Sequence, residues 1–194
     1  GNSWFVINNG LSITQFFDFD NDPTRTERSF GGTQDNGTLG TFGSMEWDSL
    51  WGGDGMVTAI NHDDPDILYG NNPNGAPFRI DFKTKKGRLI VSGIDQSESA
   101  LWTAPLVVNP LDGFDLMHGR TRVYRSFDGG DLWYPSSPYF RNEISALAFS
   151  PVEYGQQWAG TSAGGLWLST NAGESWQPRK QMNRSNRFIS SMQC

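Results

Sequence analysis

The chain has one cysteine and few basic residues. Because Cys194 is the single cysteine, no disulfide can form within the chain, and no Cys/His spacing suggests a zinc site. Lysine and arginine number 15 against 21 acidic residues, and no basic cluster is long enough to follow a phosphate backbone. Nucleic acid is therefore not an expected partner. The longest apolar runs are too short to cross a bilayer.

The residues that are abundant favour short strands joined by tight turns. Aromatic residues make up 13% of the chain and glycine occurs 23 times. This composition resembles neither a disordered chain nor a coiled coil. The 194 residues are enough for a substantial core.

One spacing recurs along the whole sequence. Four tryptophans and one isoleucine stand 43 residues apart, at Trp4, Trp47, Ile90, Trp133 and Trp176. A repeat of 40 to 50 residues is typical of a β-propeller, in which each repeat forms one four-stranded sheet, or blade. We therefore predict an all-β propeller of four-stranded antiparallel blades.

The repeat divides the chain into about four blades and one further strand. An apolar strand that exits on a proline, a strand that closes on glycine and a hairpin precede each tryptophan strand. The predicted blades are 5–47, 48–90, 91–133 and 134–176, and 177–194 begins a fifth blade. All of them belong to one partial propeller domain, 1–194.

The turn before the tryptophan carries the sharpest motif. Two copies fit the pattern S-x-[DN]-x-G-x-x-W, and their aspartate or asparagine can bond the turn backbone while the glycine accepts a positive φ. The tryptophan is expected to fill the space between neighbouring sheets. We expect a structural role for all eight residues, which are Ser126, Asp128, Gly130, Trp133, Ser169, Asn171, Gly173 and Trp176.

These two copies resemble the Asp-box (BNR) repeat of sialidase-like propellers. That superfamily includes sialidases, xyloglucan-degrading glycoside hydrolases and sortilin-type receptor propellers, and the segments 30–38 and 51–55 look like its uncharacterised secreted bacterial repeat proteins. The resemblance implies that the Asp box lies on the face opposite the ligand site. It does not imply sialidase catalysis, because Arg79, in a sequence similar to the sialidase F-R-I-P motif, occupies an ordinary strand position and is not followed by I-P.

The ligand face predicted by the resemblance is formed by the connections between the second and third strands and between blades. Its candidate ligand-binding residues combine flat rings, amides and carboxylates, which suit a sugar or a peptide: Gln34, Asp35, Asn36, Trp51, Asp54 and Trp102. A hydrolase would need two carboxylates flanking a cleft, and the candidates are Asp35, Asp54 and Asp95. Turn formation and loop flexibility explain Asp35 and Asp54 equally well.

An acidic strand exit offers a candidate cation site. Asp18, Asp20 and Asp22 alternate along the sequence and could bring oxygen ligands to calcium. The glycine and distal glutamate of an EF-hand loop are missing, so a solvated strand exit explains the pattern as well. We expect no other cofactor.

Two functions remain open from the sequence. The first is a non-enzymatic binding or scaffold propeller that recognises glycan or protein, in an extracellular, periplasmic or cell-surface protein of bacterial type. The second is part of a glycoside hydrolase. Four blades make an incomplete ring, so we expect either the remaining blades of a longer parent chain or a homodimer that completes the propeller.

Overall fold

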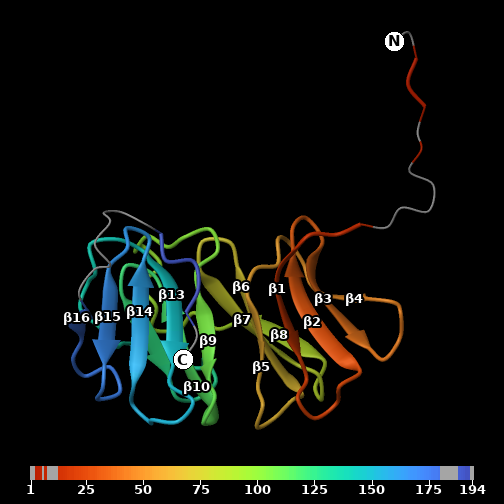
Figure 1. Ribbon diagram of the computed structural model, residues 1–194. Helices are drawn as coiled ribbons and strands as arrows, with labels where there is room; N and C mark the ends of the chain where they lie inside the picture. The colour runs from red at the N-terminus through yellow and green to blue at the C-terminus, as the bar shows by residue number, and fades with distance from the viewer. Residues whose placement is uncertain (1–2, 6, 8–12, 180–187, 193–194) are drawn as a thin grey trace.

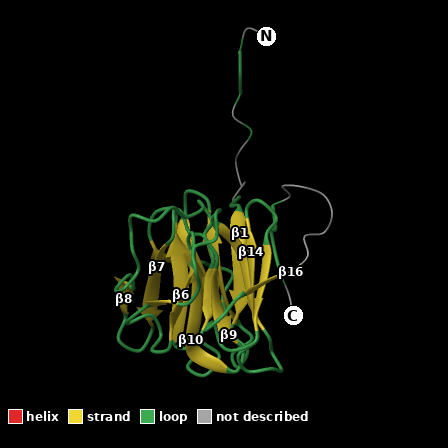
Figure 2. Ribbon diagram, turned by 90° about the vertical axis from the view of Figure 1, so that its left-hand side faces the viewer, coloured by secondary structure: helices red, strands yellow, loops and turns green. Residues whose placement is uncertain are grey.

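The computed structural model describes residues 3–5, 7, 13–179 and 188–192. These residues form strands, turns and loops, and none of them lies in a helix (Figures 1 and 2). Accordingly, no described helix is long and apolar enough to cross a membrane.

The strands make four antiparallel sheets, here called blades 1 to 4. Blade 1 contains β1 (Phe16–Asn21), β2 (Arg28–Thr33), β3 (Gly37–Phe42) and β4 (Asp48–Trp51). Blade 2 contains β5 (Thr58–Ile60), β6 (Ile67–Asn72), β7 (Ala76–Asp81) and β8 (Lys86–Leu89). Blade 3 contains β9 (Leu106–Asn109), β10 (Asp112–Gly119), β11 (Val123–Ser126) and β12 (Tyr134–Pro135). Blade 4 contains β13 (Ile144–Phe149), β14 (Gln157–Thr161), β15 (Leu166–Ser169) and β16 (Gln177–Arg179).

The four blades stand in sequence around an open axis. Each sheet keeps its strands in chain order, and the first strands β1, β5, β9 and β13 contact one another in turn (Figure 1). These four inner strands therefore line the axial side of a partial ring. The predicted all-β partial propeller is confirmed.

The blade boundaries differ from those that the 43-residue period predicted. The expected boundary fell on the tryptophan, but the outermost strand follows it in three blades, as β4 follows Trp47 and β12 follows Trp133. Blade 1 begins at Phe16, well after the predicted residue 5. The expected fifth blade is also revised, because β16 belongs to blade 4, and residues 188–192 form no strand. The rest of that segment, residues 180–187 and 193–194, lies outside the described residues.

The hydrophobic core consists of three clusters, one between each pair of neighbouring blades. Trp133 is 1% exposed between blades 2 and 3, and Trp176 is 9% exposed between blades 3 and 4. Each indole N–H donates to a backbone carbonyl of the preceding blade region, from Trp133 Nε1 to Ile90 O at 2.7 Å and from Trp176 Nε1 to Ser136 O at 2.7 Å. The recurrent tryptophan thus joins one blade to the next.

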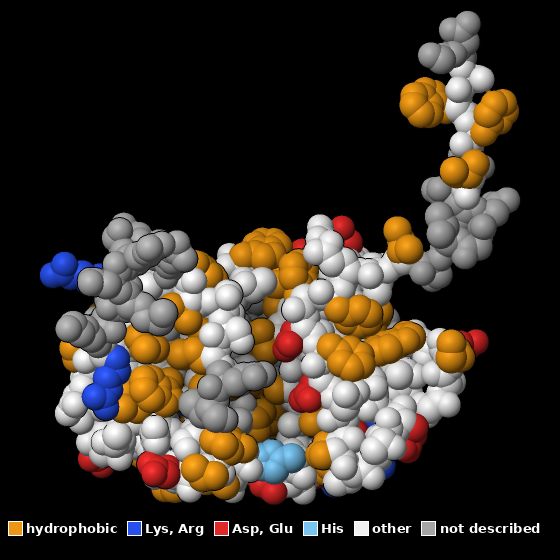
Figure 3. Space-filling view, in the orientation of Figure 1, with side chains coloured by type: hydrophobic (Ala, Val, Ile, Leu, Met, Phe, Trp, Pro, Cys, Tyr) orange, Lys and Arg blue, Asp and Glu red, His pale blue; other side chains and the backbone are white. Residues whose placement is uncertain are grey.

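Blade 1 has no described sheet on its outer side. Trp47, at the repeat position of Trp133, is 37% exposed there. Its ring packs against those of Phe16 and Phe19, at centroid distances of 5.4 Å and 6.2 Å. Hydrophobic side chains accordingly gather at this end of the molecule (Figure 3).

Candidate functional site

The two turns that fit the pattern S-x-[DN]-x-G-x-x-W make the same hydrogen bonds. In blade 3, Ser126 Oγ donates to Asp128 Oδ1 at 2.7 Å and accepts the Gly130 amide at 2.8 Å. In blade 4, Ser169 Oγ bonds Asn171 Oδ1 and the Gly173 amide at 3.0 Å and 2.9 Å. Both glycines have a positive φ, 89° and 93°. These side chains close turns between the third and fourth strands.

The candidate acids Asp35, in the β2–β3 turn, and Asp54, in the connection from blade 1 to blade 2, are neighbours. Asp54 Oδ1 accepts the Asp35 amide at 2.7 Å, and Asp35 itself has a φ of 63°. Gln34, Asp35 and Asn36 line a shallow depression of about 340 Å³ together with residues 13–15. Asp54 therefore fixes a hairpin by a backbone bond and does not face Asp35 across a cleft.

The two candidate tryptophans lie in different surroundings. The ring of Trp51 stacks on Phe78 at a centroid distance of 4.5 Å, and its Nε1 donates to Asn72 Oδ1 at 3.0 Å. Trp51 therefore helps to join blade 1 to blade 2. Trp102 is 52% exposed, and its carbonyl accepts the Asn74 amide. Neither ring lines the depression beside Gln34.

Asp95 also stabilises a turn. Its Oδ1 accepts the Ser97 hydroxyl at 2.6 Å and the Ser97 amide at 2.9 Å. These hydrogen bonds, the hydroxyl first, lower the pKa of Asp95 below its ordinary value. A carboxyl held ionised in this way is a poor general acid at neutral pH.

A buried network that sequence reasoning missed lies beside Asp95. Glu98 accepts the Tyr124 hydroxyl at 2.7 Å and pairs with Arg122 at 2.9 Å. Arg120 donates to the backbone carbonyls of Glu98 and, across the blade interface, of Gly75 at 2.7 Å. The network fastens the loop before β9 to the β6–β7 hairpin. Its acid lies in that loop and its arginines lie in the β10–β11 hairpin, so no local sequence motif signals it.

Of the three alternating aspartates, Asp18 and Asp20 bond the next blade, whereas Asp22 bonds the turn after β1. Asp18 Oδ2 accepts the Thr58 amide at 3.1 Å, and Asp20 Oδ2 accepts the Ile60 amide at 2.8 Å, so both carboxylates join β1 to β5. Burial raises the pKa of each, although the backbone bonds act in the opposite direction.

Asp22 points into the turn after β1. It pairs there with Arg25 and with the buried Arg28 at 2.9 Å and 3.1 Å. Burial alone would raise the pKa of Asp22, but the bonds from Thr24 and Arg25 outweigh it and lower the pKa. In the described part of the chain, no three acidic, histidine or cysteine side chains are grouped to hold a metal ion. The calcium candidate Asp18, Asp20 and Asp22 therefore gains no support from the geometry.

Arg79 does not reach the axis. It lies on β7, where Nη1 donates to the Gly129 carbonyl at 3.0 Å and Nη2 pairs with Asp131 at 3.2 Å. Arg79 thus binds the turn between β11 and β12 of the next blade. This contact gives it a structural role between blades 2 and 3.

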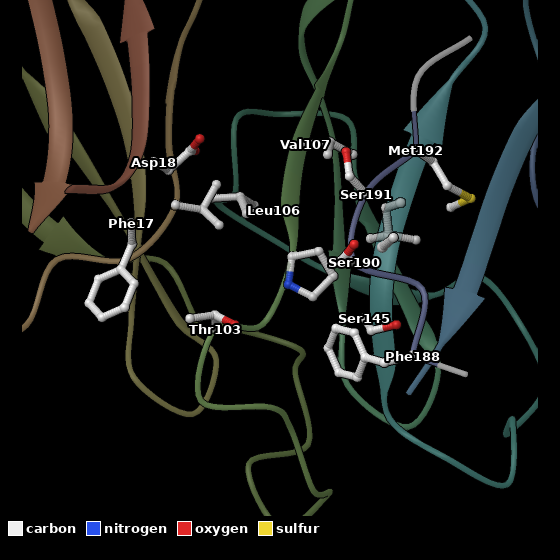
Figure 4. Close-up of a pocket in the computed structure, with 14 residues that line it drawn as sticks. Phe17, Asp18, Thr103, Leu106, Val107, Ser145, Phe188, Ser190, Ser191 and Met192 are labelled. Carbon is white, nitrogen blue, oxygen red and sulfur yellow. The ribbon is translucent and has the colours of Figure 1, made fainter. Parts of the chain in front are cut away.

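Polar and apolar groups also meet on the axial side of the blades. A cavity of about 450 Å³ opens between β1 and residues 188–192, and β9 and β13 form its floor. Figure 4 shows Phe17 and Asp18 on one wall, Ser190, Ser191 and Met192 on the other, and Leu106 between them. A second depression of about 480 Å³ continues over β1, β5 and β9 and includes Asp18 and Asp20.

Together these two hollows make the candidate site, which is called the axial groove below. It holds exposed aromatic rings from Phe17 and Phe188, hydroxyl groups and two half-buried carboxylates. Asp18 and Asp20 project from the same face of β1, because alternate residues of a strand point to the same side. Both carboxylates accept backbone amides of β5. The groove suits a polar, extended ligand with apolar patches.

A scan against protein-family models finds no match, and a search of the curated proteins finds none either. Solved structures do resemble the fold. A GH74 xyloglucanase from Xanthomonas campestris gives a TM-score of 0.64 at 17% sequence identity and covers 81% of this chain. An ancestral GH74 enzyme gives 0.71 at 15% identity over 89% of this chain. The extracellular domain of a proposed one-component system from B. thetaiotaomicron gives 0.67 at 16% identity over 91%.

The chain spans less than a third of those structures, covering 29%, 26% and 24% of their respective lengths. At this level of identity the likeness concerns the fold. Membership of the Asp-box family stays a prediction from the two turn motifs. The chain folds as four blades of a β-propeller similar to those of GH74 enzymes.

Proposed function

We propose that this chain is a binding segment of a propeller, that its axial groove holds a glycan chain, and that it does not cleave that chain. The observation that carries the proposal is the arrangement of carboxylates around the groove. A glycoside hydrolase places two carboxyl groups on opposite sides of the bond that it cleaves. Asp18 and Asp20 lie on the same side, and each already accepts a backbone amide.

The chemistry of the groove supports a sugar as the ligand. The exposed rings of Phe17 and Phe188 offer apolar surface for the C–H faces of sugar rings. Thr103, Ser190 and Ser191 supply exposed hydroxyls that can donate or accept hydrogen bonds. Two of the three structural neighbours described above are GH74 enzymes, one of them a xyloglucanase, and this favours a glycan over a protein ligand.

The alternative is part of a glycoside hydrolase whose acids come from elsewhere in a longer protein. The raised pKa of Asp18 favours it, because a general acid must be protonated near the working pH. The candidates Asp35, Asp54 and Asp95 do not favour it, since Asp54 and Asp95 hold turns and Asp35 occupies a hairpin turn position. The extracellular domain among the structural neighbours supports an extracellular or cell-envelope location.

A polysaccharide panel that includes xyloglucan tests the proposal. Binding is measured by calorimetry and cleavage by reducing-sugar release, for the unmodified chain, Phe17→Ala and Asp18→Asn. Asp35→Asn serves as the matched control, because Asp35 lies outside the axial groove. We expect the unmodified chain to bind a glycan and to release no reducing sugar from it. Phe17→Ala should weaken this binding, whereas Asp35→Asn should leave it unchanged. Release that Asp18→Asn or Asp35→Asn abolishes would support the hydrolase.

A further inference from the structure

The axial groove carries acidic side chains and no lysine or arginine. Asp18 and Asp20 line its second hollow, and among the described residues no lysine or arginine lines either hollow. The one imidazole there, that of His62, lies 3.8 Å from Asp63. On the face shown in Figure 3, acidic side chains lie near the middle, whereas the visible lysine and arginine side chains lie toward the edges. A groove lined in this way attracts cations and repels anions.

The two carboxylates of the groove have no cationic partner in the described part of the chain. Asp22, directly after β1, pairs with two arginines. Asp18 and Asp20 are half-buried, and each accepts a backbone amide of β5. Carboxylates removed from water are normally paired with a cation, because the protein solvates their charge less well than water does. Burial accordingly raises the pKa of both groups. They leave a place for a positive group that the described residues do not fill.

A hydroxyl group beside Asp18 also has no partner. Thr58 is 3% exposed and lines the second hollow. Its amide donates to Asp18, whereas its Oγ1 makes no hydrogen bond with any described residue. Buried hydroxyl groups are normally hydrogen-bonded, because an unpaired one costs free energy. The Thr58 hydroxyl and the Asp18 carboxylate together offer acceptor oxygens for an N–H donor.

The carboxylates follow one another along the groove and face an apolar wall. Asp18 and Asp20 are alternate residues of β1, so they stand about 7 Å apart along the strand. Leu106 and Val108 of β9 supply apolar surface in the same hollow. A sugar ring that carries an amino group joins both properties, because its C–H face can lie on the apolar wall while its ammonium group meets a carboxylate. A chain of such rings presents one ammonium group after another.

We propose that the axial groove selects a glycan built from amino sugars whose amino groups are free and protonated. One ammonium group pairs with Asp18, and that of a further ring pairs with Asp20. The inference rests on the proposed function, because it names the kind of glycan that the groove holds. Glycans that carry carboxylate or sulfate groups are repelled by the same two side chains.

Calorimetric titration with matched oligosaccharides tests this selection. The probes are a glucosamine oligomer, the fully N-acetylated oligomer of equal length, an oligogalacturonate and a lysine oligomer, all in one weakly acidic buffer that protonates the glucosamine amino groups. The proteins are the unmodified chain, Asp18→Asn and Asp35→Asn. An asparagine at position 18 keeps an oxygen that can accept the Thr58 amide, and urea denaturation checks that the variant folds. Asp35→Asn removes one charge outside the groove, at a φ of 63° that asparagine tolerates.

We expect the unmodified chain to bind the glucosamine oligomer at least about tenfold more tightly than the acetylated one, which is the effect of about one charge-assisted hydrogen bond. Asp18→Asn should remove this preference, and Asp35→Asn should retain it. Added salt should weaken the binding of the glucosamine oligomer more than that of the acetylated oligomer. The oligogalacturonate should not bind.

Four results would overturn the inference. If the acetylated oligomer or another neutral glycan binds as tightly as the glucosamine oligomer, the groove does not select amino sugars, although it remains a glycan site. Glucosamine binding that Asp18→Asn leaves unchanged places the ammonium group elsewhere. A lysine oligomer that binds as tightly as the glucosamine oligomer identifies a cationic peptide as the ligand. If no glycan binds, here or in the polysaccharide panel, the proposed function fails together with the inference.

Discussion

Replacing Trp133 by phenylalanine tests how the blades are held together. The indole is 1% exposed and donates to the Ile90 carbonyl at 2.7 Å, so the change removes buried ring atoms and leaves that carbonyl without its donor. The lost apolar contact and the small cavity cost about 1 kcal/mol. The unpaired carbonyl costs a further 1 to 2 kcal/mol, roughly. We therefore expect the free energy of unfolding to fall by about 2 to 3 kcal/mol.

The assay is urea denaturation followed by far-UV circular dichroism. Trp102→Phe is the matched control, because Trp102 is 52% exposed and its indole makes no hydrogen bond within the described residues. It should change the free energy of unfolding by less than about 0.5 kcal/mol. If Trp133→Phe costs no more than Trp102→Phe, the recurrent tryptophan does not join the blades and our account of the repeat fails.

Three further predictions concern the turns and the titrating groups. Ser169→Ala leaves the buried Gly173 amide unpaired and should cost about 1 to 3 kcal/mol in urea denaturation, whereas Ser175→Ala, on an exposed side chain of the same turn, should cost little. Asp18 has a raised pKa, so its stabilising contribution is present below its ordinary value of 3.8 and is lost as the pH rises through the folded value. Asp22 has a lowered pKa, so its contribution is present above 3.8 and is lost as the pH falls through the folded value. At pH 7, Asp18→Asn should therefore change the free energy of unfolding little, whereas Asp22→Asn should lower it. The opposite result would contradict the environments described for these two carboxylates. Burial lowers the pKa of His118 from 6.5 to about 3, so its contribution is present above pH 6.5 and is lost as the pH falls toward 3. The unfolding free energy should decline over that range by up to about 1.4 kcal/mol per pH unit, and His118→Gln should flatten the decline if this residue causes it.

The fold could be predicted from the sequence because its determinants are local and repeated. The turns before Trp133 and Trp176 depend on Ser126, Gly130 and their blade 4 counterparts, which are close in sequence and bond one another directly. The blade boundaries could not be predicted as well. The 43-residue repeat fixes the spacing of Trp133 and Trp176. It does not show whether the outermost strand of each blade ends or begins at the tryptophan.

The candidate site was less accessible to sequence reasoning, because its parts come from different blades. Asp35, in the β2–β3 turn, and Asp54, in the connection from blade 1 to blade 2, proved to be neighbours, whereas the axial groove joins β1 to residues 188–192. Asp18 was considered as a calcium ligand, and its actual partner, the Thr58 amide, belongs to the next blade. Which inner strands meet around the axis is a tertiary property that no single repeat contains.

The most direct test of the central claim is calorimetric titration of the chain with the glycan that binds best in the polysaccharide panel, with reducing sugar measured in the same sample. The account predicts saturable binding that Phe17→Ala weakens at least about tenfold, a loss of about 1.4 kcal/mol, with no sugar released. Binding that survives Phe17→Ala and Asp18→Asn unchanged would place the ligand outside the axial groove. Release of sugar that Asp18→Asn abolishes would contradict the claim that this propeller binds without cleaving.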